Sequence, residues 1–238
     1  MRVAVLQFES GPDYGANLDR LRTLAEEAEA DLVLAPEVCL TGFDYDRFEA
    51  AAAFAKKSEA ALLALSEKCA IALTQIEREG DAFFNVFRLY DQGRCLHAQK
   101  KHKLFLLGNE HDHFSAGAKE AIAPFEWRGW QLGVLICFEL RFVDLWQRLE
   151  GCELLLVPAA WGALRKSHYE TLCDALAIAN RCFVAASDSA NADMAAGSAI
   201  LSPWGEALRD DTQHTLARTL DKREITKMKR AIPYDTAA

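Results

Sequence analysis

Long apolar stretches are missing from this sequence, and their absence excludes a membrane protein. No segment approaches the ~18 continuous apolar residues of a membrane-spanning helix. The apolar start, Met1–Phe8, is also too short for a secretory signal, and no small-residue cleavage site follows it. We therefore expect no membrane partner.

Paired cysteine motifs are missing as well. The chain has seven cysteines, at positions 39, 69, 95, 137, 152, 173 and 182, and no CxxC pair among them. An odd number of scattered cysteines favours neither a disulfide framework nor a zinc knuckle. We expect a cytoplasmic protein in which most of these thiols are small buried apolar groups.

Phosphate-binding loops and an excess of basic charge are also absent. Neither GxGxxG nor GxxxxGK[ST] occurs, so we expect no nucleotide cofactor and no cofactor of another kind. Lys and Arg number 27 against 35 Asp and Glu, which gives a net charge of −8. Nucleic acid is therefore not an expected partner. The basic residues between Lys222 and Arg230 are typical of a solvated last helix.

The apolar segments that are present predict an α/β protein. The 238 residues are 51% hydrophobic, and no linker, low-complexity tract or repeat divides them, so we expect a single domain over 1–238. Early apolar strands alternate with helical patterns, whereas later strands follow one another as hairpins. This mixture predicts a four-layer α-β-β-α sandwich with two mixed sheets.

The periodicity also predicts the elements. Helices are expected over 47–57 and 59–68, and a capping-box pattern at Ser167–Glu170 predicts the start of another. The helical stripe Phe142, Leu145, Trp146 and Leu149 is either an exposed patch or part of the core. Strands are expected over 3–8, 31–35, 70–76, 84–90, 95–99, 130–137, 153–157, 183–187, 198–202 and 215–220.

Cys137 is the strongest candidate for a reactive residue. It closes the apolar run Gln131–Ile136 and begins a polar turn. A thiol at the tip of a buried strand is held rigidly, and neighbouring charge and a helix N-terminus lower the pKa of a thiol in such a place. The alternative is a buried core cysteine, which is the commoner fate of a cysteine at a strand end.

Glu37 and Lys101 are the candidate partners of this thiol. Glu37 directly follows the apolar run 32–36, where a carboxylate is costly unless it is paired or used. A general base is the corresponding use, and a surface loop is the alternative. Lys101 lies between Lys100 and Lys103, and spacing alone does not choose which of the three points inward. The three segments together suggest a nucleophile, a base and an electrophilic cation.

Two other chemistries compete with this interpretation. The cluster Glu110–His113 contains a His-x-His pair that zinc can bind, but no third distant ligand is indicated. We expect no metal, and Glu110 fits better as a second carboxylate supporting the site. A cysteine-protease-like dyad would use His168 with Asp174 or Asn180, although the capping-box position of His168 favours a structural role.

Three ordered motifs resemble those of the nitrilase superfamily, the carbon–nitrogen hydrolases. They are Pro36–Phe43 (Pro-Glu, three residues, Thr-Gly-aromatic), Lys101–Phe105 (a lysine three positions before a leucine) and Gly133–Phe142 around the cysteine. The segment Gly108–Phe114 is similar to the branch that contains ω-amidases. The resemblance covers the chain from Val3 to about Pro233.

The resemblance implies a set of roles. The lysine register selects Lys101, and the catalytic residues would be Glu37, Lys101, Cys137 and Glu110. Lys101 and the backbone N–H of Phe138 would form the oxyanion hole. The pocket candidates are Phe43, Arg141 and Trp161; the alternative for Arg141 is a structural ion pair with Glu139 or Asp144.

The implied activity is hydrolysis of a small aliphatic amide through a thioester, with release of ammonia and a carboxylic acid. A homodimer or higher homo-oligomer is implied as well. Alternatives are an N-carbamoyl amide hydrolase or nitrilase with the same residues, or a catalytically silent binding protein. Phe138 and Glu139 replace the usual Tyr and Asp of the cysteine segment, and Ala160 stands where Asn often occurs. These departures bear on the substrate rather than on hydrolysis.

Overall fold

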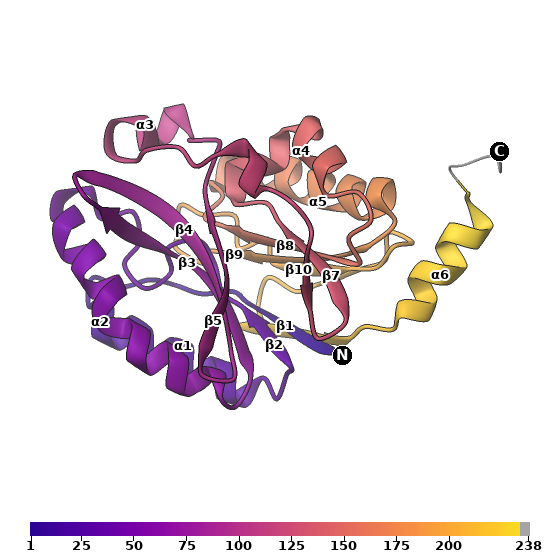
Figure 1. Cartoon of the computed structure of the whole chain (residues 1–238), viewed down its shortest axis with the longest axis horizontal. Coiled ribbons are helices and arrows are strands. Elements are labelled where there is room, and N and C mark those ends of the chain that lie inside the picture. Colours follow the sequence, from indigo (N-terminus) through magenta and orange to yellow (C-terminus); the bar gives the residue numbers. More distant parts are fainter. Residues whose placement is uncertain (234–238) are drawn as a thin grey trace.

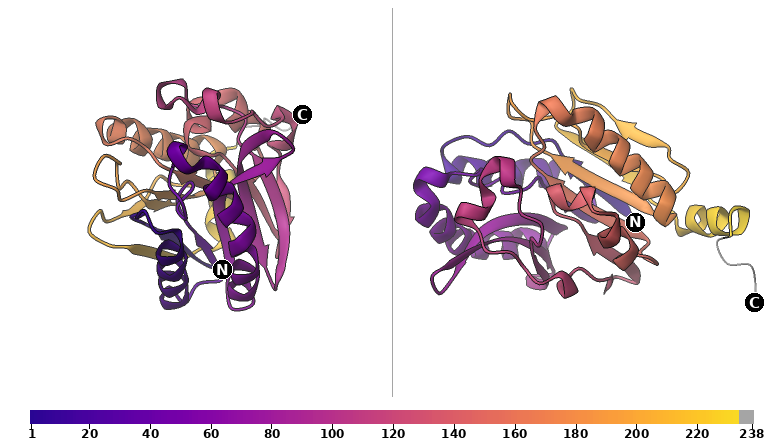
Figure 2. Two further views of the ribbon diagram at one scale, coloured as in Figure 1. Left: turned by 90° about the vertical axis from the view of Figure 1, so that its left-hand side faces the viewer. Right: turned by 90° about the horizontal axis from the view of Figure 1, so that it is seen from above.

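Two six-stranded sheets face each other at the centre of the molecule (Figures 1 and 2). The computed structural model describes residues 1–233. The first sheet has the order β12-β1-β2-β3-β4-β5, and the second has the order β11-β10-β9-β8-β7-β6. In each sheet a parallel set, β1–β3 or β7–β9, is flanked by antiparallel strands. Both sheets are therefore mixed, as expected.

The expected strands are confirmed with small shifts at their ends. The first sheet consists of β1 (Arg2–Leu6), β2 (Leu32–Leu34), β3 (Ala70–Glu79), β4 (Ala82–Asp91), β5 (Arg94–Lys100) and β12 (Thr215–Thr219). The second consists of β6 (Phe125–Trp127), β7 (Trp130–Val134), β8 (Leu154–Ala159), β9 (Phe183–Asp188), β10 (Ala199–Leu201) and β11 (Ala207–Arg209). The edge strands β6 and β11 were not expected, because they are short, carry charged residues and lie partly exposed, whereas the equally short β2 and β10 are buried apolar runs.

Helices cover the outer faces and complete the four layers. α1 (Tyr14–Glu27) and α2 (Phe48–Ser66) lie on the first sheet, and α4 (Val143–Arg148) and α5 (Lys166–Asn180) lie on the second (Figure 2). The short α3 (Glu110–His113) lies above the strand ends, and α6 (Lys222–Ala231) extends to one side (Figure 1). None of the helices within residues 1–233 has the length and apolarity that crossing a membrane requires.

Three helix predictions need correction. The segments 47–57 and 59–68 form one continuous helix, because the buried Ser58 donates its hydroxyl to Ala55 O inside the helix and does not interrupt it. The capping box at Ser167–Glu170 is wrong: α5 begins earlier, at Lys166, and has no side-chain cap. The stripe Phe142–Leu149 is not an exposed patch, since Leu145 and Leu149 are fully buried.

The apolar strands are continuous runs because both of their faces are covered. Val3, Val5, Leu32 and Leu34 pack against the second sheet, in one cluster with the residues of β7 and β8. Alternate residues of the same strands, including Ala4 and Val33, pack in a separate cluster with the apolar face of α1. This double burial fixes the register of each strand and so the positions of the loops at the strand ends.

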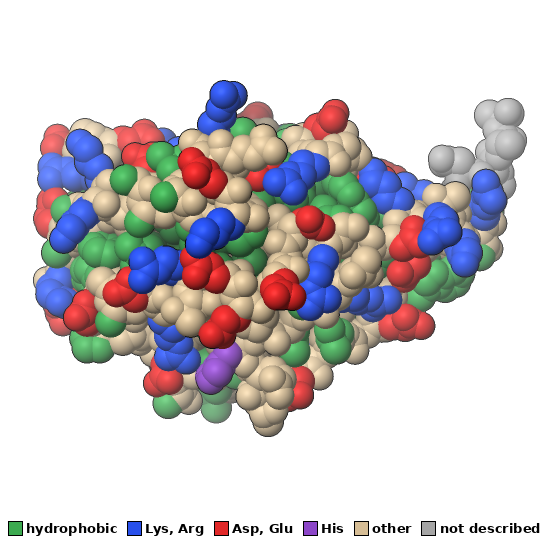
Figure 3. All heavy atoms as spheres, turned by 90° about the horizontal axis from the view of Figure 1, so that it is seen from below, with side chains coloured by type: hydrophobic (Ala, Val, Ile, Leu, Met, Phe, Trp, Pro, Cys, Tyr) green, Lys and Arg blue, Asp and Glu red, His purple; other side chains and the backbone are tan. Residues whose placement is uncertain are grey.

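The surface at the opposite end from α3 carries charges of both signs. Figure 3 shows acidic and basic side chains interspersed over this face, with no large area of a single sign. This distribution offers no electrostatic footprint for a nucleic acid on that face.

The packing between β7 and its neighbours leaves no room at Gly133. A Cβ there would lie 2.8 Å from Leu149 Cδ2, 2.8 Å from Leu155 Cδ2 and 2.9 Å from Cys152 Sγ. Because these neighbours are fully buried, we expect Gly133→Ala to lower the free energy of unfolding by ~1–3 kcal/mol in urea denaturation. Gly11→Ala is the matched control: its Cβ would meet only Asn17 Oδ1, at 3.6 Å, and equal losses in both variants would contradict the overpacking account.

Candidate active site

Strand ends place the three candidate residues of the sequence motifs. Glu37 lies three residues after β2, and Lys101 directly follows β5. Cys137 lies three residues after β7, in the second sheet. The Glu37 N–H donates to Ala159 O at the end of β8, at 3.2 Å, which joins the glutamate loop of the first sheet to the second sheet.

Lys101 is fully buried between two carboxylates. Its Nζ lies 2.6 Å from Glu37 Oε1 and 2.7 Å from Glu110 Oε1. Burial pulls the pKa of Lys101 down, but the two carboxylates outweigh it, and the net pKa lies above the ordinary lysine value. The side chain is therefore an ammonium that donates to both glutamates.

The two glutamates have further donors. Glu37 Oε1 accepts from Asn85 Nδ2 at 2.8 Å, and Glu37 Oε2 accepts from the Ala160 N–H at 3.2 Å. Glu110 Oε2 accepts from the Phe105 N–H at 2.9 Å. Burial raises the pKa of Glu110, although Lys101 opposes this shift. Asn85 was not identified from the sequence, where its only signal is that it is a polar residue inside the apolar strand β4.

Left-handed backbone conformations occur at Cys137 and beside each of the two glutamates. Cys137 has φ +47°, Val38, next to Glu37, has φ +44°, and Asn109, next to Glu110, has φ +56°. L residues adopt this region at a cost of ~1–3 kcal/mol each, and a β-branched residue such as Val38 is a genuine outlier. Such strain persists where the surrounding structure over-determines the backbone, and it is concentrated at functional sites.

The Cys137 thiol differs from the sequence expectation in one respect. Burial raises the pKa of Cys137 well above that of an ordinary thiol, and the charge of Glu37 raises it further, while Lys101 lowers it. The expected net lowering is wrong, because the thiol is buried and faces two carboxylates for one ammonium. A thiolate at this position therefore requires a base that removes the proton.

The turn after Cys137 presents a free N–H. Cys137 begins a 3-10 helix, Cys137–Arg141, and Phe138 is its second residue. The first N–H groups of a helix have no partner inside it. The N–H of Phe138 is consequently available to an oxygen placed beside the thiol, as the oxyanion-hole prediction requires.

A cavity of about 590 Å³ opens onto the thiol. Its lining includes Phe43, Glu110, Cys137 and Arg165. A narrower hollow adjoins it and is lined by Phe105, Cys137, Phe138, Arg141, Ala160, Trp161, Gly162 and Arg165. The pocket candidates Phe43, Arg141 and Trp161 therefore all lie around Cys137.

Arg141 makes neither of the ion pairs considered as its alternative. The Glu139 carboxylate accepts hydrogen bonds from two backbone N–H groups, and Asp144 forms an ion pair with Lys119 at 2.6 Å. The Arg141 guanidinium instead lies 4.8 Å from the centre of the Trp161 ring and 3.2 Å from His168 Nδ1. His168 thus contacts an arginine of the hollow and does not complete a dyad with Cys137.

The cluster Glu110–His113 is not arranged around a metal. Within residues 1–233, no group of three or more His, Cys, Asp and Glu side chains is placed to hold an ion. The His113 ring stacks on Tyr45, with 4.0 Å between ring centres, and only Glu110 reaches the lysine.

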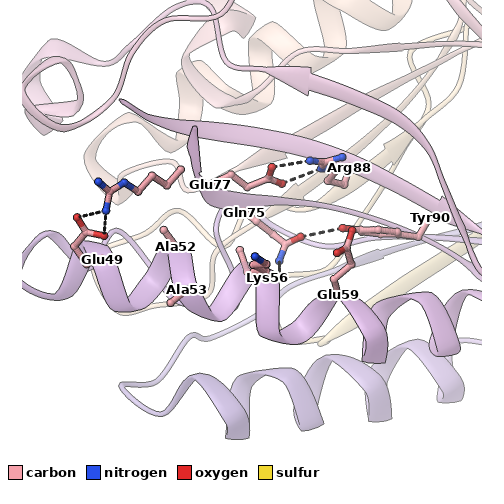
Figure 4. Close-up of a pocket in the computed structure, with 11 residues that line it drawn as sticks. Glu49, Ala52, Ala53, Lys56, Glu59, Gln75, Glu77, Arg88 and Tyr90 are labelled. Atoms are coloured by element: carbon pink, nitrogen blue, oxygen red, sulfur yellow. Dashed lines mark hydrogen bonds and ion pairs between the residues drawn. The ribbon is translucent and has the colours of Figure 1, made fainter. Parts of the chain in front are cut away.

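A second cavity, of about 340 Å³, lies between α2 and strands β3 and β4 (Figure 4). Its charged walls are largely neutralised in pairs, Glu49 with Arg78 and Glu77 with Arg88. No cysteine, serine or histidine lines it. This cavity therefore lacks a cysteine or serine nucleophile, and the cavity at Cys137 is the candidate active site.

A buried cysteine beside a Glu-Lys-Glu network, in an α-β-β-α sandwich, defines a hydrolase of the nitrilase type. The chain belongs to the carbon–nitrogen hydrolase family, whose sequence model matches residues 2–230. It is 31% identical over 217 residues to the omega-amidase YafV of Escherichia coli, covering 87% of this chain and 82% of that one. It is 27% identical to the 2-oxoglutaramate amidase of Bacillus subtilis, covering 97% of this chain and 95% of that one.

Solved structures share the fold. Nit3 of Saccharomyces cerevisiae, a member of branch 10 of the nitrilase superfamily, superposes with a TM-score of 0.88 at 24% identity, covering 98% of this chain and 94% of that one. An amidase from Nesterenkonia sp., with acrylamide added at its active-site cysteine, superposes with a TM-score of 0.83 at 24% identity, covering 97% of each chain. These likenesses confirm the sandwich architecture.

Glu139 ties the lysine loop to the cysteine turn. It is fully buried and accepts from the His102 N–H at 2.6 Å and from the Ile136 N–H at 2.7 Å. One carboxylate thus bridges the residue after Lys101 and the residue before Cys137. Burial raises the pKa of Glu139 to about 7.

The raised pKa of Glu139 predicts a pH-dependent stability. The folded pKa of about 7 exceeds the ordinary value of 4.5. The contribution of Glu139 to the free energy of unfolding is therefore complete below about pH 4.5 and is lost as pH rises through about 7. Relative to Glu139→Gln, the native protein should lose roughly 2–3 kcal/mol of unfolding free energy between these limits, measured in urea.

The comparison isolates the titration of one residue. Asp188, whose pKa burial also raises to about 7, is present in both proteins and cancels in the difference. The amide of Glu139→Gln cannot accept with both of its terminal atoms, which adds a cost that does not vary with pH. A difference in unfolding free energy that stays constant from pH 4.5 to 8 would rule out the raised pKa.

Proposed function

We propose that this protein is an amidase that hydrolyses small aliphatic amides, with Cys137 as nucleophile, Glu37 as general base and Lys101 as oxyanion donor. The observation that carries the proposal is the buried Glu37–Lys101–Glu110 network at the cavity that holds Cys137. The omega-amidase and 2-oxoglutaramate amidase relatives support an amide whose acid product is a small aliphatic carboxylate.

Acylation is the first chemical step. Glu37 takes the proton of the Cys137 thiol, and the sulfur forms a bond to the carboxamide carbon while the carbonyl electron pair moves to oxygen. Lys101 Nζ and the Phe138 N–H donate to this oxyanion; loss of one such donor typically costs ~10²–10³ in rate. Protonated Glu37 then gives its proton to the nitrogen, the C–N bond breaks, and ammonia leaves.

Deacylation repeats the sequence with water. Glu37 removes a proton from water, whose oxygen attacks the thioester carbon, and the same two donors stabilise the second oxyanion. The C–S bond breaks, the sulfur regains a proton from Glu37, and the carboxylic acid is released. Glu110 keeps the Lys101 ammonium fixed throughout, because its Oε1 accepts from Nζ at 2.7 Å.

Other functions of the same catalytic residues would differ in the substrates that the protein accepts. An N-carbamoyl amide hydrolase would release ammonia only from carbamoyl compounds, and a nitrilase would act on nitriles. A silent binding protein would release none. Ammonia release across a panel of amides, carbamoyl compounds and nitriles separates these functions.

The mechanism predicts the outcome of substitutions at the network. Cys137→Ala should abolish turnover of an aliphatic amide and prevent the acyl adduct that acid quenching and mass spectrometry detect on the native protein. Glu37→Gln and Lys101→Met should each lower kcat by at least ~10². Circular dichroism should show that each variant remains folded at the assay temperature.

Cys95→Ala is the matched control for the nucleophile, because Cys95 is an exposed free cysteine on β5. It should keep the native rate and the native adduct. An adduct that persists in Cys137→Ala, or a fully active Lys101→Met, would overturn the assigned roles.

A homodimer or higher homo-oligomer is part of the proposal. Val143 and Ile178, on α4 and α5, are 56% and 46% exposed, and a depression of about 300 Å³ beside Val143 is lined by Trp146, Asn180 and Lys229. Light scattering should give at least twice the 26.5 kDa of one chain, and Val143→Glu should shift the protein toward monomer. A native protein that remains monomeric at micromolar concentration would contradict this assignment.

The single-domain organisation over 1–238 and the cytoplasmic location remain predictions. The family match over residues 2–230 supports the first. The seven free cysteines, six of them buried, support a reducing compartment.

A further inference from the structure

We infer that Arg165 is a specificity residue that binds the remote carboxylate of a dicarboxylic monoamide. The inference rests on the proposed amidase function and assigns the part of the substrate that does not react. Arg165 was not among the residues selected from the sequence.

Arg165 lies where the two hollows meet. It is the last residue of the 3-10 helix Ala163–Arg165, and it lines both the cavity of about 590 Å³ and the narrower hollow, as Cys137 does. Its guanidinium carbon lies 5.3 Å from the centre of the Phe105 ring. An amide whose carbonyl carbon is at the sulfur therefore extends into space that this guanidinium borders.

The Arg165 guanidinium has no polar partner among residues 1–233: neither a hydrogen bond nor an ion pair involves it. Arg141, the arginine favoured by the sequence, differs in this respect. Its guanidinium contacts His168 Nδ1 and covers the Trp161 ring, and it lines only the narrower hollow. Arg165 is thus the arginine whose donors remain available to a ligand.

The carboxylates that line the cavity leave the Arg165 guanidinium available to an anion. Two carboxylates line the larger cavity, Glu110 and Asp193. Glu110 is paired with Lys101, which it shares with Glu37, and Asp193 is exposed to solvent; neither carboxylate pairs with Arg165. A neutral amide leaves the guanidinium without a counter-charge, whereas a substrate carboxylate can accept two parallel N–H bonds from it.

The neighbouring backbone is built to hold this arginine. The Arg165 N–H donates to Gly162 O at 2.9 Å, and the Arg165 carbonyl accepts from Trp161 Nε1 at 2.8 Å. A Cβ on Gly162 would lie 2.6 Å from Arg165 Nη2. The glycine therefore leaves the space that the guanidinium occupies, and Gly162→Ala would displace the flexible end of Arg165 without removing its charge.

The test compares two amides of similar length that differ in the remote group. The ratio of kcat/KM for succinamate to kcat/KM for pentanamide is measured in the native protein and in Arg165→Met. We expect the native ratio to exceed one and to fall about 10- to 100-fold in Arg165→Met, mainly through KM for succinamate. Arg165→Lys should give an intermediate ratio, because it keeps the charge but not the two-pronged geometry.

Two further variants make the test specific. Gly162→Ala should lower the ratio in the same direction as Arg165→Met, since it moves the guanidinium. Arg94→Met is the matched control: this exposed arginine lies at the start of β5, far along the strand from Lys101, and its loss changes the net charge equally. It should leave the ratio at the native value.

The possible results separate this inference from the proposed function. A native protein that releases ammonia from neither amide, nor from any other amide, would refute the amidase itself. A native protein that hydrolyses both amides, with a ratio that Arg165→Met and Gly162→Ala leave unchanged, would overturn the role of Arg165 alone. A fall in the ratio in Arg141→Met but not in Arg165→Met would assign the carboxylate to Arg141 and also overturn the inference. If Arg165→Met fails to fold, Arg165→Lys and Gly162→Ala still decide between these results.

Discussion

The ion pairs of Lys101 with Glu37 and Glu110 are the interaction on which the site depends. A lysine and two glutamates have been removed from water at a desolvation cost of several kcal/mol for each ion. Contacts of 2.6 and 2.7 Å, and the N–H donors that complete the two carboxylates, offset that cost. Each member depends on the others, because removing one partner of a buried ion pair typically costs ~3–5 kcal/mol. The network therefore holds three loops, from β2, from β5 and around α3, in one arrangement.

The same constraint accounts for the backbone around the site. Val38, Asn109 and Cys137 have positive φ angles, which the sandwich can sustain because double-sided burial fixes the strands that lead into these turns. Glu139 adds a direct link between the lysine loop and the cysteine turn. The geometry at the sulfur is thus determined by the ends of two sheets, and the thiol contributes little to its own placement.

Much of this organisation could be predicted from the sequence. The continuous apolar runs before Glu37 and Cys137 predicted buried strands, and the resemblance to the nitrilase superfamily selected Lys101 among three lysines. The edge strands β6 and β11 could not be predicted, because they are short and partly exposed and form no continuous apolar run. The expected lowering of the Cys137 pKa was wrong, because the burial of the thiol and the number of carboxylates that face it are properties of the assembled site. Asn85, Glu139 and Arg165 were missed or left without a role, since hydrogen bonds to distant loops and the space left by Gly162 have no signature in the linear order.

The location of the site at the seam between the sheets has a consequence for the nascent chain. The base and the ammonium follow β2 and β5 of the first sheet, the sulfur follows β7 of the second sheet, and β12, which completes the first sheet, is synthesised after all of them. A partly formed molecule with only one sheet in place holds either the thiol or the Glu37–Lys101–Glu110 charges, but not the two together. Catalytic turnover at Cys137 therefore requires the two sheets to have docked, because only then do the sulfur, its base and the ammonium meet.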